Sequence, residues 1–174
     1  AEYVMRMRQE GRSLVDVERD FAAEIPVEIR GQERTALLRG QIDRLEQDAA
    51  GRAYIVDLKT GKSAPKKADL EGHPQLAAYQ EAVRQGALED VPAVPGGAAL
   101  VQLGTTSKGV SVQEQPPLGA EDKSALAMIE EAAALMSADS FDTVHDPARS
   151  GYGGHGCRLP EICPLCTEGK QVTE

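Results

Sequence analysis

The chain has 174 residues, a length that suits one domain, and 41% of them are hydrophobic, which is enough for a core. Aromatic residues make up only 3% and there is no Trp, so the core is expected to be mainly aliphatic. The formal net charge of -9 argues against a protein that coats nucleic acid through bulk electrostatics, because phosphate contacts come from Lys and Arg. Any contact with a polyanion should therefore be local.

No segment has the roughly 18 consecutive apolar residues that a membrane-spanning helix needs, and no signal-peptide pattern opens the chain. We therefore expect a soluble, cytoplasmic protein without a membrane partner. The chain begins at Ala1, without an initiator Met and inside sequence of helical character, which suggests a fragment of a longer protein.

The first elements are expected to be a short helix and a strand. A helical stripe of apolar residues opens the chain and ends by residues 11–13. Over residues 25–29 apolar and polar side chains alternate, which is the pattern of a half-buried strand, and Pro26 argues for an edge strand or a bulge. Residues 31–34 are predicted to form a turn.

Residues 35–47 and 52–60 predict two more strands, and the polar connection DAAG between them suits a hairpin. If this hairpin turns about Ala50, Asp43 faces Asp57 across the two strands. Facing Cβ atoms lie about 4.5 to 5.5 Å apart, and like charges at that separation destabilise a sheet unless something neutralises them. A divalent cation is the simplest such group.

Alternation along the strand places Lys59 on the same face as Asp57, two residues further on. Two acids, an amine and a divalent cation suit phosphodiester hydrolysis: oxygen ligands hold Mg²⁺, the metal activates water, and the ammonium stabilises developing charge. An alternative is that Asp43 and Asp57 are ion-paired surface residues, because a register slip of one residue would reverse the faces.

The second half of the chain continues the alternation of helices and strands. Residues 60–70 form a loop rich in Gly, Pro, Ser and Lys, and a helix is predicted over residues 74–85, with a Gly as its stop. Residues 98–104 predict an apolar strand, and residues 110–113 a short partner. Residues 121–137 predict a helix with acids in its first turn. Its expected apolar stripe comprises Leu126, Ile129, Ala133 and Met136.

Basic residues gather between positions 52 and 67, where the only acid is Asp57. They are Arg52, Lys59, Lys62, Lys66 and Lys67. This stretch is a candidate for the local DNA contact, and a solvated, Lys-rich loop is the alternative.

The stretch GQIDRLEQDAAGRAYIVDLKTGK resembles the nuclease motif of the PD-(D/E)XK superfamily in its RecB/AddB form, in which a Gly-x-x-Asp-Arg strand precedes an Asp-x-Lys-Thr-Gly strand. Here these are residues 40–44 and 57–61. The resemblance implies an α/β, restriction-endonuclease-like fold, with a mixed central β-sheet flanked by helices. It further implies that Mg²⁺ or Mn²⁺ is held by Asp43, Asp57 and the Leu58 carbonyl, and that Lys59 is the catalytic lysine.

Two further motifs extend the resemblance. The segment HPQLAAY is similar to the family's Gln-x-x-x-Tyr motif, and Gln75 and Tyr79, four residues apart, share a helix face that can point at the active site. The motif by itself is not specific, and a Tyr that serves only the core is the alternative. Glu18 resembles an additional metal-binding acid of the family, with a surface glutamate as the alternative.

Three cysteines, Cys157, Cys163 and Cys166, lie within ten residues, which points to metal rather than to disulfides. Three thiolates are one short of a structural zinc site or a [4Fe-4S] cluster. The resemblance implies a cluster whose fourth Cys lies upstream of this chain, although five residues and then two separate the cysteines where the family has two and then five. Zinc with His155, and unliganded thiols, remain alternatives.

We thus expect a nuclease core over residues 1–145 and a Cys-containing tail over residues 146–174. The resemblance implies a metal-dependent DNA exonuclease acting on single-stranded ends supplied by a UvrD/Rep-type, ATP-dependent helicase motor in the same polypeptide. A second helicase-nuclease subunit is a further candidate partner. The expected role is double-strand-break processing for recombinational repair.

The family's metal-binding His would lie upstream, so the isolated chain is expected to be incomplete. Two alternatives stay open. The first is an inactive nuclease-fold module that binds DNA or acts as a scaffold. The second is a stand-alone zinc-binding interaction domain.

Overall fold

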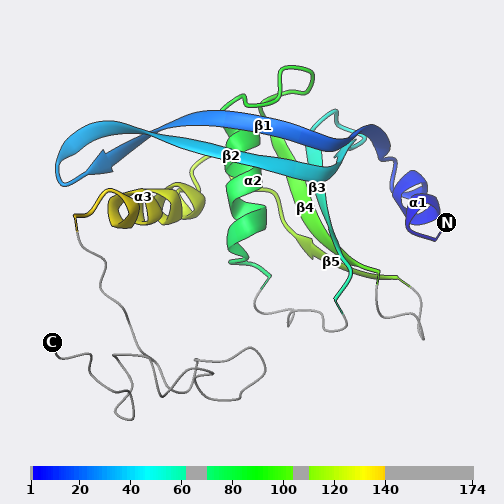
Figure 1. The fold of residues 1–174 in the computed structure, drawn as a ribbon. Helices are drawn as coiled ribbons and strands as arrows, with labels where there is room; N and C mark the ends of the chain where they lie inside the picture. Colours follow the sequence, from blue (N-terminus) through cyan, green and yellow to red (C-terminus); the bar gives the residue numbers. More distant parts are fainter. Residues whose placement is uncertain (1, 62–69, 104–109, 140–174) are drawn as a thin grey trace, which may run out of the picture. The chain divides into compact units, whose positions relative to one another are not determined.

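The computed structural model describes residues 2–61, 70–103 and 110–139. Within them, five strands form one mixed sheet in the order β1-β2-β3-β4-β5, with helices on its faces (Figure 1). This confirms the predicted α/β fold class, a restriction-endonuclease-like mixed sheet flanked by helices. The elements are α1 Glu2–Gln9, β1 Ser13–Ile29, β2 Gln32–Gln47, β3 Ala53–Lys59, α2 Pro74–Arg84, β4 Pro95–Gln102, β5 Ser111–Gln115 and α3 Ser124–Met136.

The direction of each strand follows from its connection. β1, β2 and β3 are successively antiparallel, and β5 is antiparallel to β4. β3 and β4 are parallel. Parallel neighbours need a crossover connection, and α2 lies in the crossover between these two strands. α2 is therefore the next helix or strand after β3 among the described residues, and it packs against that strand.

Side chains from both faces of the sheet are buried. Ile55 and Leu100 belong to the larger core, which α2 and α3 cover. Tyr54 and Val56 point to the other face, where they pack with Tyr3 of α1. Because alternate residues of β3 face two different cores, this strand carries the nearly continuous apolar run that is typical of a central strand.

The outer parts of β1 and β2, residues 23–38, form a two-stranded ribbon that we call the arm. The arm extends beyond β3, which pairs with β2 over residues 44–47, and runs along α3 (Figure 1). Its β1 side chains alternate strictly, with Ile25 and Val27 buried in the larger core. Arg30 and Gly31 form the turn at its tip with φ values of 52° and 73°, as a two-residue hairpin turn requires.

Some predictions about these strands are confirmed and others are wrong. β1 is an edge strand, as Pro26 indicated. However, it begins at Ser13, so the pattern over residues 25–29 captured only its last third. The turn predicted over residues 31–34 is confined to Arg30 and Gly31, and β2 already starts at Gln32.

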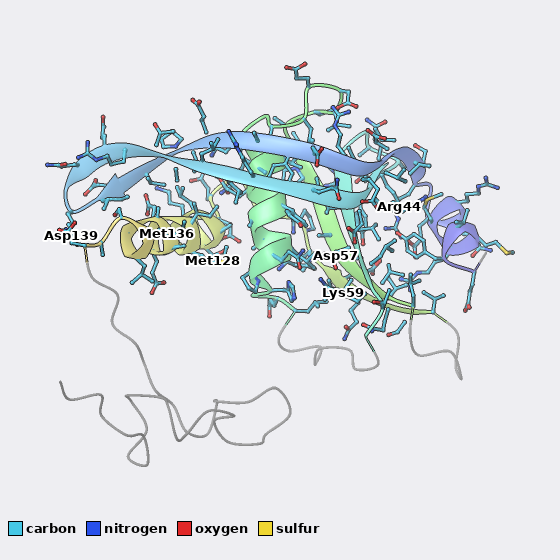
Figure 2. All side chains as sticks on the ribbon, in the orientation of Figure 1. Arg44, Asp57, Lys59, Met128, Met136 and Asp139 are labelled. Atoms are coloured by element: carbon cyan, nitrogen blue, oxygen red, sulfur yellow. The ribbon has the colours of Figure 1, made fainter. Side chains whose placement is uncertain are left out.

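The last helix is shorter than predicted. α3 begins at Ser124, directly after its N-cap residue Lys123, so the acids precede the first turn rather than occupying it. The Asp122 carboxylate accepts the backbone N–H of Ser124 at 2.9 Å. Of the expected apolar stripe, Ile129 is buried but Met136 is 79% exposed (Figure 2). The helical period in the sequence was correct, but the last turn of α3 has little to pack against.

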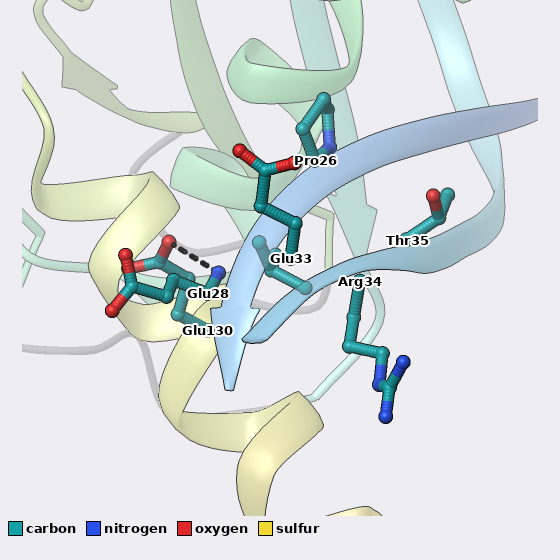
Figure 3. Close-up of a pocket in the computed structure, with 7 residues that line it drawn as sticks. Pro26, Glu28, Glu33, Arg34, Thr35 and Glu130 are labelled. Atoms are coloured by element: carbon teal, nitrogen blue, oxygen red, sulfur yellow. Dashed lines mark hydrogen bonds between the residues drawn. The ribbon is translucent and has the colours of Figure 1, made fainter. Parts of the chain in front are cut away.

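A hollow of about 460 Å³ lies where the arm meets α3. Its lining includes Glu33 and Arg34, and Glu130 of α3 accepts the backbone N–H of Glu28 at 3.2 Å (Figure 3). This hollow includes none of the candidate site residues, so it belongs to the packing of the arm.

Residues Ala1–Ser137 form one compact unit. The predicted boundary between residues 145 and 146 lies outside the described residues. Among the described helices, not one combines the length and the apolar character needed to cross a membrane.

Candidate active site

The site begins where β2 and β3 separate. Leu45 pairs with Ile55, which is the register that the hairpin predicted. One residue beyond the paired segment, the Asp43 carboxylate accepts the backbone N–H of Leu58 at 2.7 Å. The side chain of Asp43 thus takes the place of a backbone acceptor on β2. Its carboxylate lies against the backbone next to Asp57.

Asp57 is a buried acid, only 3% exposed, at the end of β3. The Nζ atom of Lys59 lies 2.8 Å from its Oδ2 atom (Figure 2). This ion pair lacks the angles of a hydrogen bond, and Oδ2 has no hydrogen-bond partner among the described residues. A buried carboxylate is costly unless it is compensated, so Lys59 supplies the neighbouring positive charge that Asp57 needs.

A chain of hydrogen bonds connects Lys59 to α2. Its Nζ atom donates to Oε1 of Gln75 at 3.0 Å, and Nε2 of Gln75 donates to the Tyr79 hydroxyl at 2.9 Å. That hydroxyl in turn donates to the backbone carbonyl of Gln41 at 3.1 Å. The spacing of four residues on α2 therefore joins β3 to β2 across the site.

Two aromatic rings explain why β2 has a glycine at position 40. A Cβ atom there would lie 2.8 Å from the Phe21 ring and 3.4 Å from the Tyr79 ring. The two rings meet edge to face, with centroids 5.6 Å apart. The missing side chain lets Phe21 lie over β2 and hold Tyr79 in place from the side.

His73 is a site neighbour that the sequence did not reveal. It is the N-cap residue of α2, and its Nδ1 atom is buried without a hydrogen-bond partner among the described residues. Burial, and next the charge of Lys59, lower the pKa of His73 from its ordinary value, while Asp57 acts in the opposite direction. The imidazole is therefore held neutral beside the ion pair. Its position just before the predicted helix was the available signal.

Glu18 is the predicted site residue that the structure does not bring into contact with the others. It adopts a φ of 51° in β1, and the strand register on either side places it level with Asp43 of β2. Its side chain is exposed and, in the described part of the chain, makes no hydrogen bond or ion pair. The three predicted cluster ligands, Cys157, Cys163 and Cys166, lie outside the described residues.

The donors that the site offers fit a hard divalent cation. Asp43 and Asp57 are oxygen ligands, and the Oδ2 atom of Asp57 is a buried acceptor without a hydrogen bond. Nowhere in residues 2–61, 70–103 and 110–139 do three or more His, Cys, Asp or Glu side chains gather closely enough to hold a metal. A cation such as Mg²⁺, which keeps several of its waters, needs fewer protein ligands than that.

An α/β domain that presents two acids and a lysine where two antiparallel strands separate has the layout of a restriction-endonuclease-like domain. The chain belongs to the PD-(D/E)XK nuclease superfamily, which it matches over residues 1–164. Members of this superfamily are generally nucleases and typically use Mg²⁺ or a similar divalent metal.

Among solved structures, the crystal structure of SSO0001 is similar with a TM-score of 0.44 and 13% sequence identity. The similarity covers 79% of this chain and 56% of that one, so the chain spans just over half the length of SSO0001. No curated protein was found to match this chain.

Proposed function

We propose that this domain is a metal-dependent deoxyribonuclease in which Asp43, Asp57 and Lys59 carry the reaction. The observation that carries the proposal is the buried Asp57 carboxylate, whose Oδ2 atom is 2.8 Å from Lys59 Nζ and has no hydrogen bond. A structural ion pair at this place would gain little from burial, since desolvation offsets the attraction. The buried carboxylate is useful, however, at a site where a metal ion replaces the lysine ammonium as its partner.

Asp43 and Asp57 would hold the divalent metal, together with the Leu58 carbonyl. The N–H and C=O groups of a residue in a strand point to the same side, so the Leu58 carbonyl faces β2, as does the N–H that Asp43 accepts. When bound, such a metal lowers the pKa of a water molecule and polarises the phosphoryl oxygen.

Lys59 would stabilise the negative charge that develops on the phosphate during hydrolysis. With a metal on Asp57, its ammonium is free to turn from that carboxylate toward the substrate while keeping its hydrogen bond to Gln75. Gln75 sets the direction of the amine, and Tyr79 fixes Gln75 through their 2.9 Å hydrogen bond. Both are therefore proposed as catalytic-site residues.

The more specific part of the proposal is a RecB/AddB-type exonuclease acting on single-stranded DNA ends. It is supported by the two motif segments, residues 40–44 and 57–61, and by the contact between Lys59 and Gln75. We propose that a helicase motor in the same polypeptide supplies these ends, with a second helicase-nuclease subunit as a candidate partner. The work of such an enzyme is double-strand-break processing in recombinational repair.

The cysteines support a second cofactor in the longer protein. Cys157, Cys163 and Cys166 would bind a [4Fe-4S] cluster together with a cysteine upstream of this chain. Anaerobic purification of the full-length protein should yield iron and acid-labile sulfide in about a four-to-four ratio. One zinc per chain without iron would instead identify a zinc site.

The nuclease proposal is tested by cleavage of single-stranded and double-stranded DNA by the full-length protein with Mg²⁺ or Mn²⁺. We expect cutting that Asp57→Ala abolishes, whereas Glu24→Ala, which removes an exposed acid of the arm, leaves it unchanged. Tight DNA binding without cutting by the unmodified protein would refute the proposal and favour a scaffold module.

A further inference from the structure

Two buried glutamine side chains meet behind the site. Gln80 of α2 is fully buried and Gln115, the last residue of β5, is 3% exposed. The Nε2 atom of Gln80 donates to Oε1 of Gln115 at 2.9 Å and to the carbonyl of Pro116 at 3.1 Å. Its Oε1 atom accepts the N–H of Leu118 at 3.0 Å. Gln80 is therefore bonded through both ends of its amide.

Gln115 uses its own amide to hold the segment that leads into α2. Its Nε2 atom donates to the carbonyls of Leu70 at 2.9 Å, Glu71 at 3.1 Å and His73 at 3.4 Å. The His73 carbonyl also accepts the first helical N–H, from Ala77. One side chain thus gathers three backbone acceptors at the point where the helix starts.

These bonds hold α2 from a face other than the one that touches Lys59. Gln80 lies five residues after Gln75, which on a helix is a rotation of about 140°. Gln75 points to the Lys59 ammonium, while Gln80 points to β5. The first two turns of α2 are therefore held from two sides, by the hydrogen bond between Lys59 and Gln75 in front and by the two buried amides behind.

Burying a pair of amide side chains in a core costs desolvation free energy. Buried polar groups require every hydrogen bond to be made, and apolar side chains of similar volume would pack at least as stably. A fully hydrogen-bonded pair of amides does, however, hold α2 in one position, because any shift of α2 would break several directed bonds at once. This is useful where a small displacement of a reacting group has a large effect on rate.

We propose that Gln80 and Gln115 are positioning residues for the nuclease reaction, because they fix the start and the second turn of α2 and so hold Gln75 and the Lys59 ammonium in place. This inference rests on the proposed function. It assigns a role in catalysis to two residues that lie on the far side of α2 from Lys59.

The test is a double-mutant cycle in the full-length protein. Gln115→Met keeps the volume but removes the donor, and Gln75→Ala removes the group through which the effect should reach Lys59. We expect Gln115→Met to lower kcat about ten-fold or more with KM nearly unchanged. In the Gln75→Ala background the same change should lower kcat less than about two-fold.

A purely structural role predicts a different result. The effect of Gln115→Met would then be the same in both backgrounds, and this outcome overturns the inference. Val27→Ala, a core change in the arm, is the matched control: it should lower the midpoint of thermal unfolding without changing kcat. If Gln115→Met does not fold, Gln80→Met is used in the same cycle, because it leaves the bonds from Gln115 to the three carbonyls intact.

Failure of the proposed function has its own signature. If the unmodified protein does not cut DNA with either metal, the nuclease proposal fails and the positioning role with it. If the unmodified protein cuts and Asp57→Ala does not, but the cycle shows independent effects, only the positioning role is wrong.

Discussion

The arm and the candidate active site belong to the same sheet, yet different interactions hold them. In the arm, Ile25 and Val27 face the core and their neighbours face water, so burial of apolar surface stabilises it. At the site, Asp57, Gln80 and Gln115 are buried, and each depends on specific polar partners. Apolar burial thus holds the arm, whereas the site also depends on directed polar contacts.

The largest effect should come from the site itself. Lys59→Met removes the ammonium, and we expect the rate of DNA cleavage to fall about 10²- to 10³-fold, as for other lost electrostatic contacts. Binding of Mn²⁺, measured by calorimetry without DNA, should become tighter, because the amine no longer competes for Asp57. Weaker Mn²⁺ binding in Lys59→Met would show that the amine and the metal do not share this carboxylate.

A core substitution in the arm should lower stability but leave the rate of cleavage unchanged. Ile25→Ala deletes a fully buried side chain, and we expect the free energy of unfolding to fall by about 2 to 5 kcal/mol. Cleavage below the unfolding temperature should keep its normal rate, since none of the hydrogen bonds or ion pairs of the described site residues involves the arm. Urea unfolding and a cleavage assay on the same preparation provide both measurements. A parallel loss of rate would break the contrast between the two regions.

Gly40 lies where the two regions meet, so it should affect both properties. In Gly40→Ala the new Cβ, 2.8 Å from Phe21, must displace a ring that also touches Tyr79. We expect a loss of about 1 to 3 kcal/mol in the free energy of unfolding, together with a slower reaction. Adding Phe21→Leu should relieve part of both effects. If it relieves neither, the ring is not what the glycine accommodates.

The smallest effect concerns pH. Burial and the charge of Lys59 lower the pKa of His73, so the folded protein holds fewer protons than the unfolded chain just below the ordinary histidine value of 6.5. Stability from this source is present above pH 6.5 and lost as the pH falls through the lowered pKa. His73→Gln should make the free energy of unfolding less dependent on pH in this range. An unchanged pH dependence would mean that His73 titrates normally.

The sequence predicted the centre of the fold better than its edges. The register of the β2–β3 hairpin and the position of α2 followed from alternation, a short polar turn and Pro74, all of which act locally. The first half of β1 was missed because its apolar and polar residues do not alternate: Leu14 and Val17 are exposed, and an irregular register after Leu14 interrupts the period. The exposure of Met136 was missed because a helical period cannot tell where the partner surface ends.

The residues in and around the candidate site also divide into those that the sequence predicted and those that it did not. Asp43, Asp57, Lys59, Gln75 and Tyr79 were predicted from motifs, and the structure places them close together through hydrogen bonds and an ion pair. Gln80, Gln115 and His73 were not predicted, since the pattern of a single sequence does not show which polar residues of a helix, a strand or a helix cap are buried. Their roles depend on which element packs behind α2, and that is a property of the tertiary structure alone.

The Lys59–Asp57 contact has a consequence for how this domain matures. The positive charge that makes the buried acid tolerable is covalently attached to the chain two residues away, so the polypeptide can reach its native state before any ion arrives. Removal of the metal by a chelator should then leave a folded protein that can bind metal again, whereas a zinc finger unfolds when its metal is removed. Under the proposed function, folding and metal binding would be separate events.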